Sequence, residues 1–124
     1  GEDFIDAQGQ RIANALLTEE PTPPRSYAYC SDTRYKEDII PLIQGADMLY
    51  HESTFQEDLI DKTVPTGHST ALQAAQIAKR ARVGRLILGH FSSRYEDINS
   101  FAEEAKTVFP KVVAGVEGET YTAL

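Results

Sequence analysis

The hydrophobic and polar positions along the chain follow two alternating patterns. Short runs rich in apolar, aromatic and β-branched residues predict strands. These strands are expected at residues 26–31, 46–51, 85–90, 112–116 and 120–124. Apolar residues at helical spacing predict helices between them, at residues 37–44, 70–83 and 97–109. The resulting order, β-α-β-α-β-α-β-β, predicts an α/β fold with a mostly parallel sheet.

The ends of the predicted helices carry capping signals. Thr70 with Gln73 three residues later fits a capping box, which begins the helix at 70–83. Gly84 is expected to end that helix, and Gly45 is expected to end the helix at 37–44.

Two stretches show neither pattern. Residues 1–25 are predicted to form an irregular or edge-like lead-in, because the Pro-Thr-Pro-Pro run at 21–24 prevents regular hydrogen bonding. Residues 56–67 are predicted to form a polar loop.

Composition narrows the class of protein. With 124 residues, 41% of them hydrophobic and 25% charged, the chain suits one globular domain. No apolar run approaches the roughly 20 residues that cross a bilayer, and the first residues do not resemble a signal peptide. The single cysteine, Cys30, excludes an internal disulfide and a cysteine-cluster metal site. We therefore expect a reduced, cytoplasmic setting and no membrane partner.

The net charge of −7 conceals an asymmetry between the two halves of the chain. Residues 1–62 carry 13 acidic and 5 basic side chains, whereas residues 63–124 carry 6 acidic and 7 basic ones. No acidic residue occurs from Val64 to Tyr95. That stretch is typical of a solvated helix face followed by a strand edge, and it also fits a local surface for an anionic ligand. Its basic residues are Lys79, Arg80, Arg82, Arg85 and Arg94.

Chemically active residues follow three of the predicted strands. Asp32 follows the first strand, His51 and Glu52 end the second, and His90 ends the third. Ligands of open α/β sheets bind outside the carboxyl ends of the strands, so we expect these side chains to meet at one edge. His68 joins them from the loop before a predicted helix. Imidazole and carboxylate are the ligand set of a zinc or related hydrolytic site.

Each of these residues also has a structural explanation. Asp32 and Glu52 are both followed by residues typical of turns or helix caps, and a single histidine at a strand end often serves only as a hydrogen-bonding group. Two protein ligands, Asp32 and His90, are too few for a catalytic zinc ion. A metal-dependent hydrolytic site and a set of structural residues therefore both stay open at this point.

Four short motifs occur in order along the chain: Ser-Asp-Thr-Arg at 31–34, His-Glu-Ser-Thr-Phe at 51–55, Gly-His-Ser-Thr at 67–70 and Gly-His-Phe-Ser-Ser-Arg-Tyr at 89–95. Together they resemble the second half of the ribonuclease Z family, tRNA 3′-processing endonucleases of the metallo-β-lactamase fold. The resemblance implies that residues 26–124 are the C-terminal half of a four-layer αββα domain.

The resemblance implies a role for the residues at the predicted edge. Asp32 matches a carboxylate that bridges two zinc ions, and His90 matches a terminal ligand of one of them. Glu52 matches a residue that orients a catalytic histidine. His68 matches a histidine that helps to protonate the leaving 3′ oxygen.

The same resemblance implies the partners. Ser69 and Thr70 would lie near the tRNA acceptor end, and Arg94 would meet a phosphate. Precursor tRNA is the implied substrate, two zinc ions per active site are the implied cofactors, and a homodimer is the implied assembly.

Several features of the family pattern are missing or changed in this sequence. The family's His-x-His-x-Asp-His motif, a further histidine ligand and the tRNA-gripping arm have no counterpart in the 124 residues. Ser53 replaces the family's usual Ala, and Gly89 replaces its usual Thr. We therefore expect a fragment of a longer chain that is inactive alone and leaves an apolar sheet face open, which dimerisation would cover.

The expected function is that of the C-terminal part of a zinc-dependent endoribonuclease. The reaction would remove the 3′ trailer of precursor tRNA by phosphodiester hydrolysis and leave a 3′-hydroxyl on the tRNA. Two alternatives stay open: another phosphodiesterase of the same fold with a small substrate, and a non-catalytic α/β binding module.

Overall fold

A four-stranded sheet forms the centre of the computed structural model, which describes residues 1–123. All neighbouring strands of this sheet are parallel, in the order β3-β4-β5-β6. The strands span Tyr27–Cys30 (β3), Met48–Glu52 (β4), Leu86–Gly89 (β5) and Val112–Ala114 (β6). The prediction of an α/β fold with a parallel sheet is confirmed.

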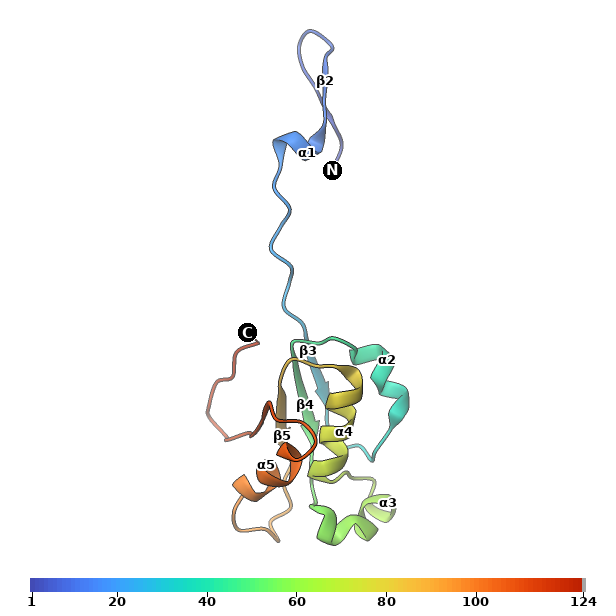
Figure 1. Cartoon of the computed structure of the whole chain (residues 1–124), viewed down its shortest axis with the longest axis vertical. Coiled ribbons are helices and arrows are strands. Elements are labelled where there is room, and N and C mark those ends of the chain that lie inside the picture. Colours follow the sequence, from blue (N-terminus) through green and yellow to red (C-terminus); the bar gives the residue numbers. More distant parts are fainter. Residues whose placement is uncertain (124) are drawn as a thin grey trace.

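Three helical segments cover one face of the sheet (Figure 1). They are a 3-10 turn at Glu37–Ile39 that continues into α2 (Ile40–Ile43), then α4 (Ala71–Ala81) and α5 (Asn99–Lys106). Between them and the sheet lies the core, which includes the fully buried Leu49, Ile77, Leu86, Leu88 and Phe101. None of the helices among the described residues is long and apolar enough to cross a membrane.

Helix α4 begins as predicted but ends differently. The Thr70 hydroxyl accepts from the Gln73 backbone N–H while the Gln73 side chain accepts from the Thr70 N–H, which confirms the capping box. The left-handed residue that ends the helix is Arg82, with φ 53°, and not Gly84. Position 84 requires glycine for a different reason: the backbone passes so close to Asp47 that a Cβ there would lie 2.6 Å from the Asp47 carbonyl oxygen. Gly45, with φ +74°, ends the preceding helix as expected.

The predicted polar loop at 56–67 is wrong, because most of it is helical. A 3-10 segment spans Glu57–Lys62 and leads into α3, Thr63–Thr66. Pro65 is tolerated there because it lies in the first turn, where backbone N–H groups have no partner within the helix. Gly67, with φ 73°, ends the segment.

The second predicted C-terminal strand is also not formed over residues 120–123, and residue 124 lies outside the described part. The chain turns back after β6 instead, and the Tyr121 hydroxyl accepts a hydrogen bond from the Val116 N–H at 3.0 Å. Arg85 lies over the Tyr121 ring, 5.6 Å from its centroid. These contacts hold the tail beside the sheet instead of in it.

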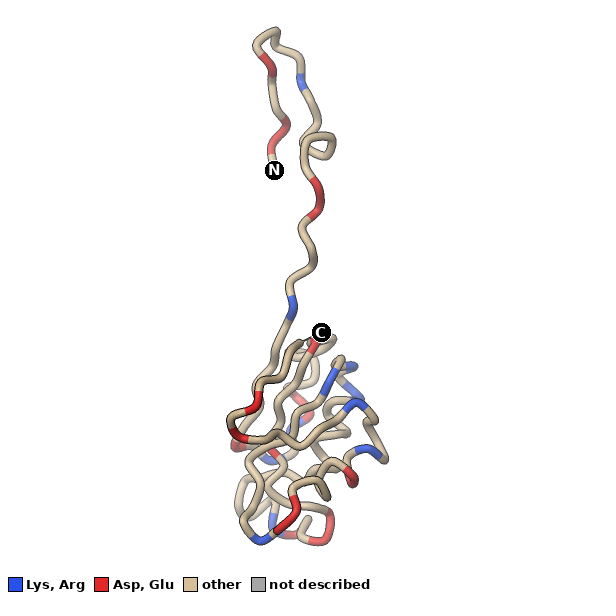
Figure 2. The backbone as a smooth tube through the Cα atoms, turned by 90° about the vertical axis from the view of Figure 1, so that its left-hand side faces the viewer, with Lys and Arg blue, Asp and Glu red and all other residues tan. Residues whose placement is uncertain are grey.

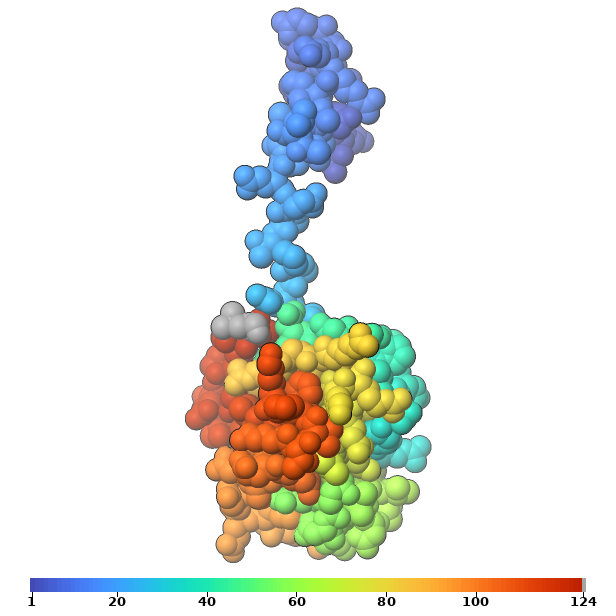
Figure 3. Space-filling view, viewed as in Figure 1, coloured from blue at the N-terminus to red at the C-terminus, as the bar shows by residue number. Residues whose placement is uncertain are grey.

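Residues 1–25 form an arm that projects from the body (Figures 1 and 3). The arm contains the antiparallel hairpin of β1 (Phe4–Ile5) and β2 (Arg11–Ile12), followed by α1 (Asn14–Leu17). Four of its large apolar side chains are exposed: Phe4, Ile5, Leu16 and Leu17.

Candidate functional site

The carboxyl edge of the sheet brings the predicted site residues together. Asp32, Glu52 and His90 come from the ends of β3, β4 and β5, and His68 comes from the turn before α4. The His68 Nδ1 lies 2.6 Å from Glu52 Oε1 and 3.6 Å from Asp32 Oδ1. The His68 and His90 rings lie 5.1 Å apart between centroids. Three strand ends and one loop therefore form a single constellation of two carboxylates and two imidazoles.

Glu52 is the hydrogen-bonding centre of this constellation and is fully buried. Its Oε1 accepts from the backbone N–H of Thr33 and contacts His68 Nδ1. Its Oε2 accepts from the N–H groups of Thr54 and Ser69 and from the Thr54 hydroxyl. A carboxylate offers about four lone-pair positions, so these partners occupy it. Glu52 therefore orients its neighbours and has no capacity left for a metal ion.

Asp32 and His90 have the opposite character. Both are exposed, and both have a left-handed backbone, with φ 54° and 59° respectively. Non-glycine residues rarely adopt that conformation, and such outliers concentrate at functional sites. Their carboxylate and imidazole are free to face a ligand outside the sheet edge.

A metal ion is compatible with the donor atoms at this edge. Ligand atoms of Glu52, His68 and His90 lie within 4.8 Å of one another. Because Glu52 is saturated by its neighbours, Asp32 and His90 are the better candidates for ligands. Carboxylate oxygen and imidazole nitrogen are donor types that fit zinc.

His51 does not join the site, contrary to the expectation that it reaches the edge as a pair with Glu52. Successive side chains of a strand point to opposite faces, so His51 points into the fully buried layer that contains Leu49. Its Nδ1 lies 2.7 Å from the Glu52 carbonyl oxygen, while its Nε2 has no partner within residues 1–123. Burial lowers the pKa of His51, because the charged imidazolium is poorly solvated there.

The residues expected to meet substrate differ in accessibility. Ser69 and Thr70 are fully buried; the Ser69 hydroxyl donates to the Thr33 carbonyl and the Thr70 hydroxyl donates to Glu57. Arg94 is exposed in the loop after β5. Contact of these three with substrate stays a prediction, and for Ser69 and Thr70 it requires internal hydrogen bonds to be exchanged.

The basic residues of the acid-free stretch do not gather at the site. Helix α4 starts at the carboxyl edge and runs back, so Lys79, Arg80 and Arg82 lie at the opposite edge, as does Arg85 before β5. Figure 2 shows several of the body's Lys and Arg positions near the end where the arm enters. Arg80 forms an ion pair with Glu37. Only Arg94 of this set follows a site residue, so the local anionic-ligand surface stays a prediction and most of the basic stretch does not contribute to this site.

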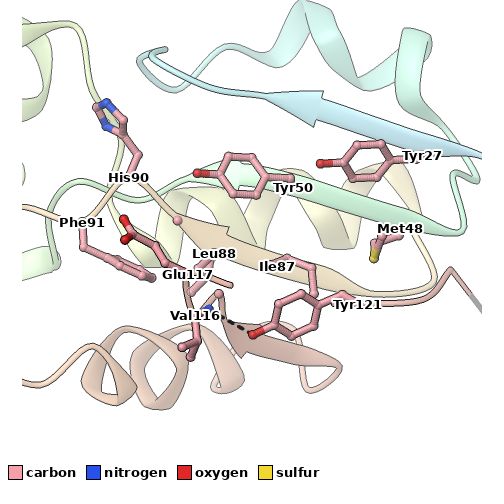
Figure 4. A pocket seen from close by; sticks show the side chains of 12 residues that line it. Tyr27, Met48, Tyr50, Ile87, Leu88, His90, Phe91, Val116, Glu117 and Tyr121 are labelled. Atoms are coloured by element: carbon pink, nitrogen blue, oxygen red, sulfur yellow. Dashed lines mark hydrogen bonds between the residues drawn. The ribbon is translucent and has the colours of Figure 1, made fainter. Parts of the chain in front are cut away.

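An open face of the sheet continues from the site. A cavity of about 630 Å³ extends along it, with Tyr27 and Tyr50 on one side and Tyr121 on the other (Figure 4). Tyr27 and Tyr29 are 55% and 65% exposed, although they are large side chains on the central sheet. His90 lines the end of this cavity.

Thr54 is a site residue that sequence reasoning missed. Its hydroxyl lies between Glu52 and His90, at 2.8 Å and 2.9 Å. The only local signal is its position two residues after Glu52, a spacing at which Thr hydroxyls bond to nearby groups. The contact with His90 spans 36 positions and depends on the pairing of β4 with β5.

Many known proteins match the chain in sequence. No family model matches the chain. Ribonuclease Z of Parabacteroides distasonis is 49% identical over 118 residues, which is 95% of this chain and 39% of that protein. Ribonuclease Z of Cytophaga hutchinsonii is 48% identical over 124 residues, again covering 39% of that protein. The chain matches the C-terminal part of ribonuclease Z.

Solved structures extend the match to ribonuclease Z from sequence to fold. The metallo-β-lactamase fold protein YhfI from Bacillus subtilis is 35% identical, with a TM-score of 0.63 over 69% of this chain and 35% of that one. A long-form RNase Z from yeast is 26% identical, with a TM-score of 0.61 over 70% of this chain and 12% of that one. The predicted metallo-β-lactamase fold is confirmed, and the chain spans 39% of the length of its ribonuclease Z relative from P. distasonis.

Proposed function

We propose that this chain is the C-terminal part of a zinc-dependent endoribonuclease that removes the 3′ trailer of precursor tRNA. The reaction is hydrolysis of a phosphodiester that leaves a 3′-hydroxyl on the tRNA. The observation that carries the proposal is the buried Glu52–His68 pair beside two exposed candidate ligands, Asp32 and His90, at one sheet edge. The ribonuclease Z identities of 42–49% support it.

Asp32 and His90 would hold the metal at this edge. Zinc bound there would supply an acidified water and neutralise charge on the phosphate. Asp32 presents an exposed carboxylate with a second oxygen available, which suits a bridge between two ions. The other ligands would come from the part of the protein outside these residues.

His68 would act as the proton donor. Its Nδ1 is held by Glu52, so its Nε2 is the nitrogen left to face substrate. Glu52 fixes the orientation of the His68 ring through this 2.6 Å contact. The proton would pass from Nε2 to the 3′ oxygen as the phosphodiester bond breaks. Arg94 would contact a phosphate of the tRNA.

The assembly follows from the incomplete site and the open face. We propose that residues 26–124 form the second half of a metallo-β-lactamase domain and that residues 1–25 lead into it. The first half of the domain would cover the exposed Tyr27 and Tyr29. We also propose that the complete protein is a homodimer and that it is located in the cytoplasm.

A second candidate is a phosphodiesterase of the same fold with a small substrate. The similarity to YhfI, which is named only for its fold, shows that the match is not confined to proteins named ribonuclease Z. The site residues at the sheet edge would be the same in both cases, so only the substrate separates them.

The decisive experiment reconstitutes the chain with the upstream part that complete ribonuclease Z proteins carry. We expect the reconstituted protein to cleave precursor tRNA after the discriminator base with zinc, and to stop when a chelator removes the metal. We expect the 124-residue chain alone to be inactive, because Asp32 and His90 supply too few ligands. Cleavage of small phosphodiesters but not of precursor tRNA would favour the second candidate.

A further inference from the structure

The hydroxyl of Thr54 connects the buried carboxylate to the exposed histidine. Thr54 Oγ1 lies 2.8 Å from Glu52 Oε2 and 2.9 Å from His90 Nδ1. Glu52 is fully buried and Thr54 is 8% exposed, so water does not compete freely for these contacts. Glu52, Thr54 and His90 thus form a continuous chain of hydrogen bonds from the sheet interior to its edge.

The direction of these hydrogen bonds follows from counting protons. Both oxygens of Glu52 face backbone N–H groups, from Thr33, Thr54 and Ser69, which can only donate. The carboxylate therefore accepts, and the single hydrogen of the Thr54 hydroxyl is directed to it. A hydroxyl that has given its hydrogen can only accept from its second partner. The His90 Nδ1 must then carry a hydrogen and donate it to Thr54.

We propose that Thr54 is a positioning residue that selects the tautomer of His90. With the hydrogen on Nδ1, the neutral imidazole keeps its lone pair on Nε2, which is the nitrogen presented outside the sheet edge. Metal-binding histidines commonly have the second nitrogen held in this way, and such partners fix both the tautomer and the ring orientation. The inference rests on the proposed function, in which His90 binds a metal ion.

Thr54 also supports the backbone around His90. His90 has φ 59°, a strained conformation that requires support from its surroundings. The Thr54 carbonyl accepts from the Ser92 N–H at 3.0 Å, so Thr54 holds this turn by its main chain as well as its hydroxyl. Glu52 consequently orients both histidines, His68 directly and His90 through Thr54.

The test compares Thr54→Val, which removes the hydroxyl and keeps the shape, with Thr54→Ser, which keeps the hydroxyl. Zinc affinity is measured in the complete protein by competition with a chromophoric chelator, and melting temperature is measured alongside. We expect the Val variant to bind zinc roughly 10- to 100-fold more weakly, as for other residues that support metal ligands, and the Ser variant to match the wild type. Equal affinities of the Val variant and the wild type, or equal losses in Val and Ser, would overturn the proposal.

A second measurement does not depend on the variants folding. In metal-free wild-type protein at about pH 8.5, where an ordinary histidine is neutral, the ¹⁵N shifts of the His90 ring report its tautomer. We expect the hydrogen on Nδ1; a hydrogen on Nε2 overturns the inference. If the wild type binds no zinc or cuts no precursor tRNA, the proposed function fails, whereas the tautomer still decides the role of Thr54.

Discussion

The ring of Tyr50 occupies the space that a side chain at position 89 would need. A Cβ on Gly89 would lie 2.5 Å from Cε2 and Cζ of Tyr50, closer than Cβ atoms approach other atoms in proteins, so the outer end of the ring would have to shift. Tyr50 is held there by a stack on Tyr29, with centroids 4.8 Å apart and an angle of 18° between the rings. Gly89 directly precedes His90, and Tyr50, Gly89 and His90 line the same cavity, so this packing lies beside the candidate ligand.

We therefore predict that Gly89→Ala destabilises the chain through Tyr50. The free energy of unfolding should fall by about 1–3 kcal/mol, the usual range for overpacking. In a Tyr50→Ala background the same substitution should cost less, because the clash is gone. Urea unfolding of the two single variants and the double variant gives the coupling energy.

Gly45→Ala is the matched control for this prediction. Gly45 has φ +74° and no neighbouring atom within 4 Å of a Cβ, so its substitution strains only the backbone. Its cost should be the same in the wild-type chain and in the Tyr50→Ala background. A Gly89→Ala cost that is also the same in both backgrounds would show that Tyr50 is not the cause.

The two carboxylates of the site should respond to substitution in opposite ways. Glu52→Gln places an amide, which carries its own hydrogens, among donors that require an acceptor, and should cost at least about 2 kcal/mol of stability. Asp32→Asn changes an exposed side chain, and Asn tolerates the left-handed backbone at this position. It should alter stability by no more than about 0.5 kcal/mol while the complete protein loses zinc.

Urea unfolding and zinc content, measured on both variants, test this contrast. Full zinc occupancy in Asp32→Asn contradicts the role of Asp32 as a ligand. Unchanged stability in Glu52→Gln contradicts the role of Glu52 as the buried hydrogen-bonding centre.

His68→Ala should lower the rate of cleavage without removing the metal. In the complete enzyme we expect the single-turnover rate to fall by roughly 10²- to 10⁴-fold, the usual contribution of a general acid. Zinc content should stay at the wild-type level, because the Nδ1 of His68 is held by Glu52. Thr66→Ala, an exposed change in the same segment, is the control and should cleave normally. Normal single-turnover cleavage by folded His68→Ala would exclude the role of proton donor.

Acid should destabilise the chain partly through His51. Burial lowers its pKa in the folded state, whereas the unfolded chain has an ordinary value near 6.5. Below about pH 6.5 the unfolded state therefore binds a proton on His51 that the folded state does not bind. The free energy of unfolding consequently falls as the pH decreases. One such proton contributes a slope of at most about 1.4 kcal/mol per pH unit. The free energy of unfolding of His51→Leu, measured between about pH 7 and about pH 5, should have a shallower slope; equal slopes would contradict the assignment.

The order of the four sheet strands and the edge that carries the site could be predicted from the sequence, whereas the helical segment at 57–66 and the absence of a strand at 120–123 could not. Apolar spacing located β5 and α4 within two residues of their observed ends, and Thr70 with Gln73 identified the start of α4 correctly. These features depend on residues close together in the chain, since helix caps and burial periods are local. The parallel order then placed Asp32, Glu52 and His90 at one edge through topology alone.

The tertiary structure decided how those residues are used. The Thr33 N–H reaches Glu52 across 19 positions, and the Ser69 hydroxyl reaches the Thr33 carbonyl across 36. The same packing turned His51 into the core and left Asp32 exposed. Such contacts depend on strand register and on the exact approach of segments distant in the chain, and no local pattern encodes them. The sequence by itself therefore determined that Asp32, Glu52, His68 and His90 lie at one edge, because strand order and helix starts are encoded locally. The tertiary structure excluded His51, added Thr54, and decided that Glu52 is saturated by hydrogen bonds while Asp32 and His90 are exposed.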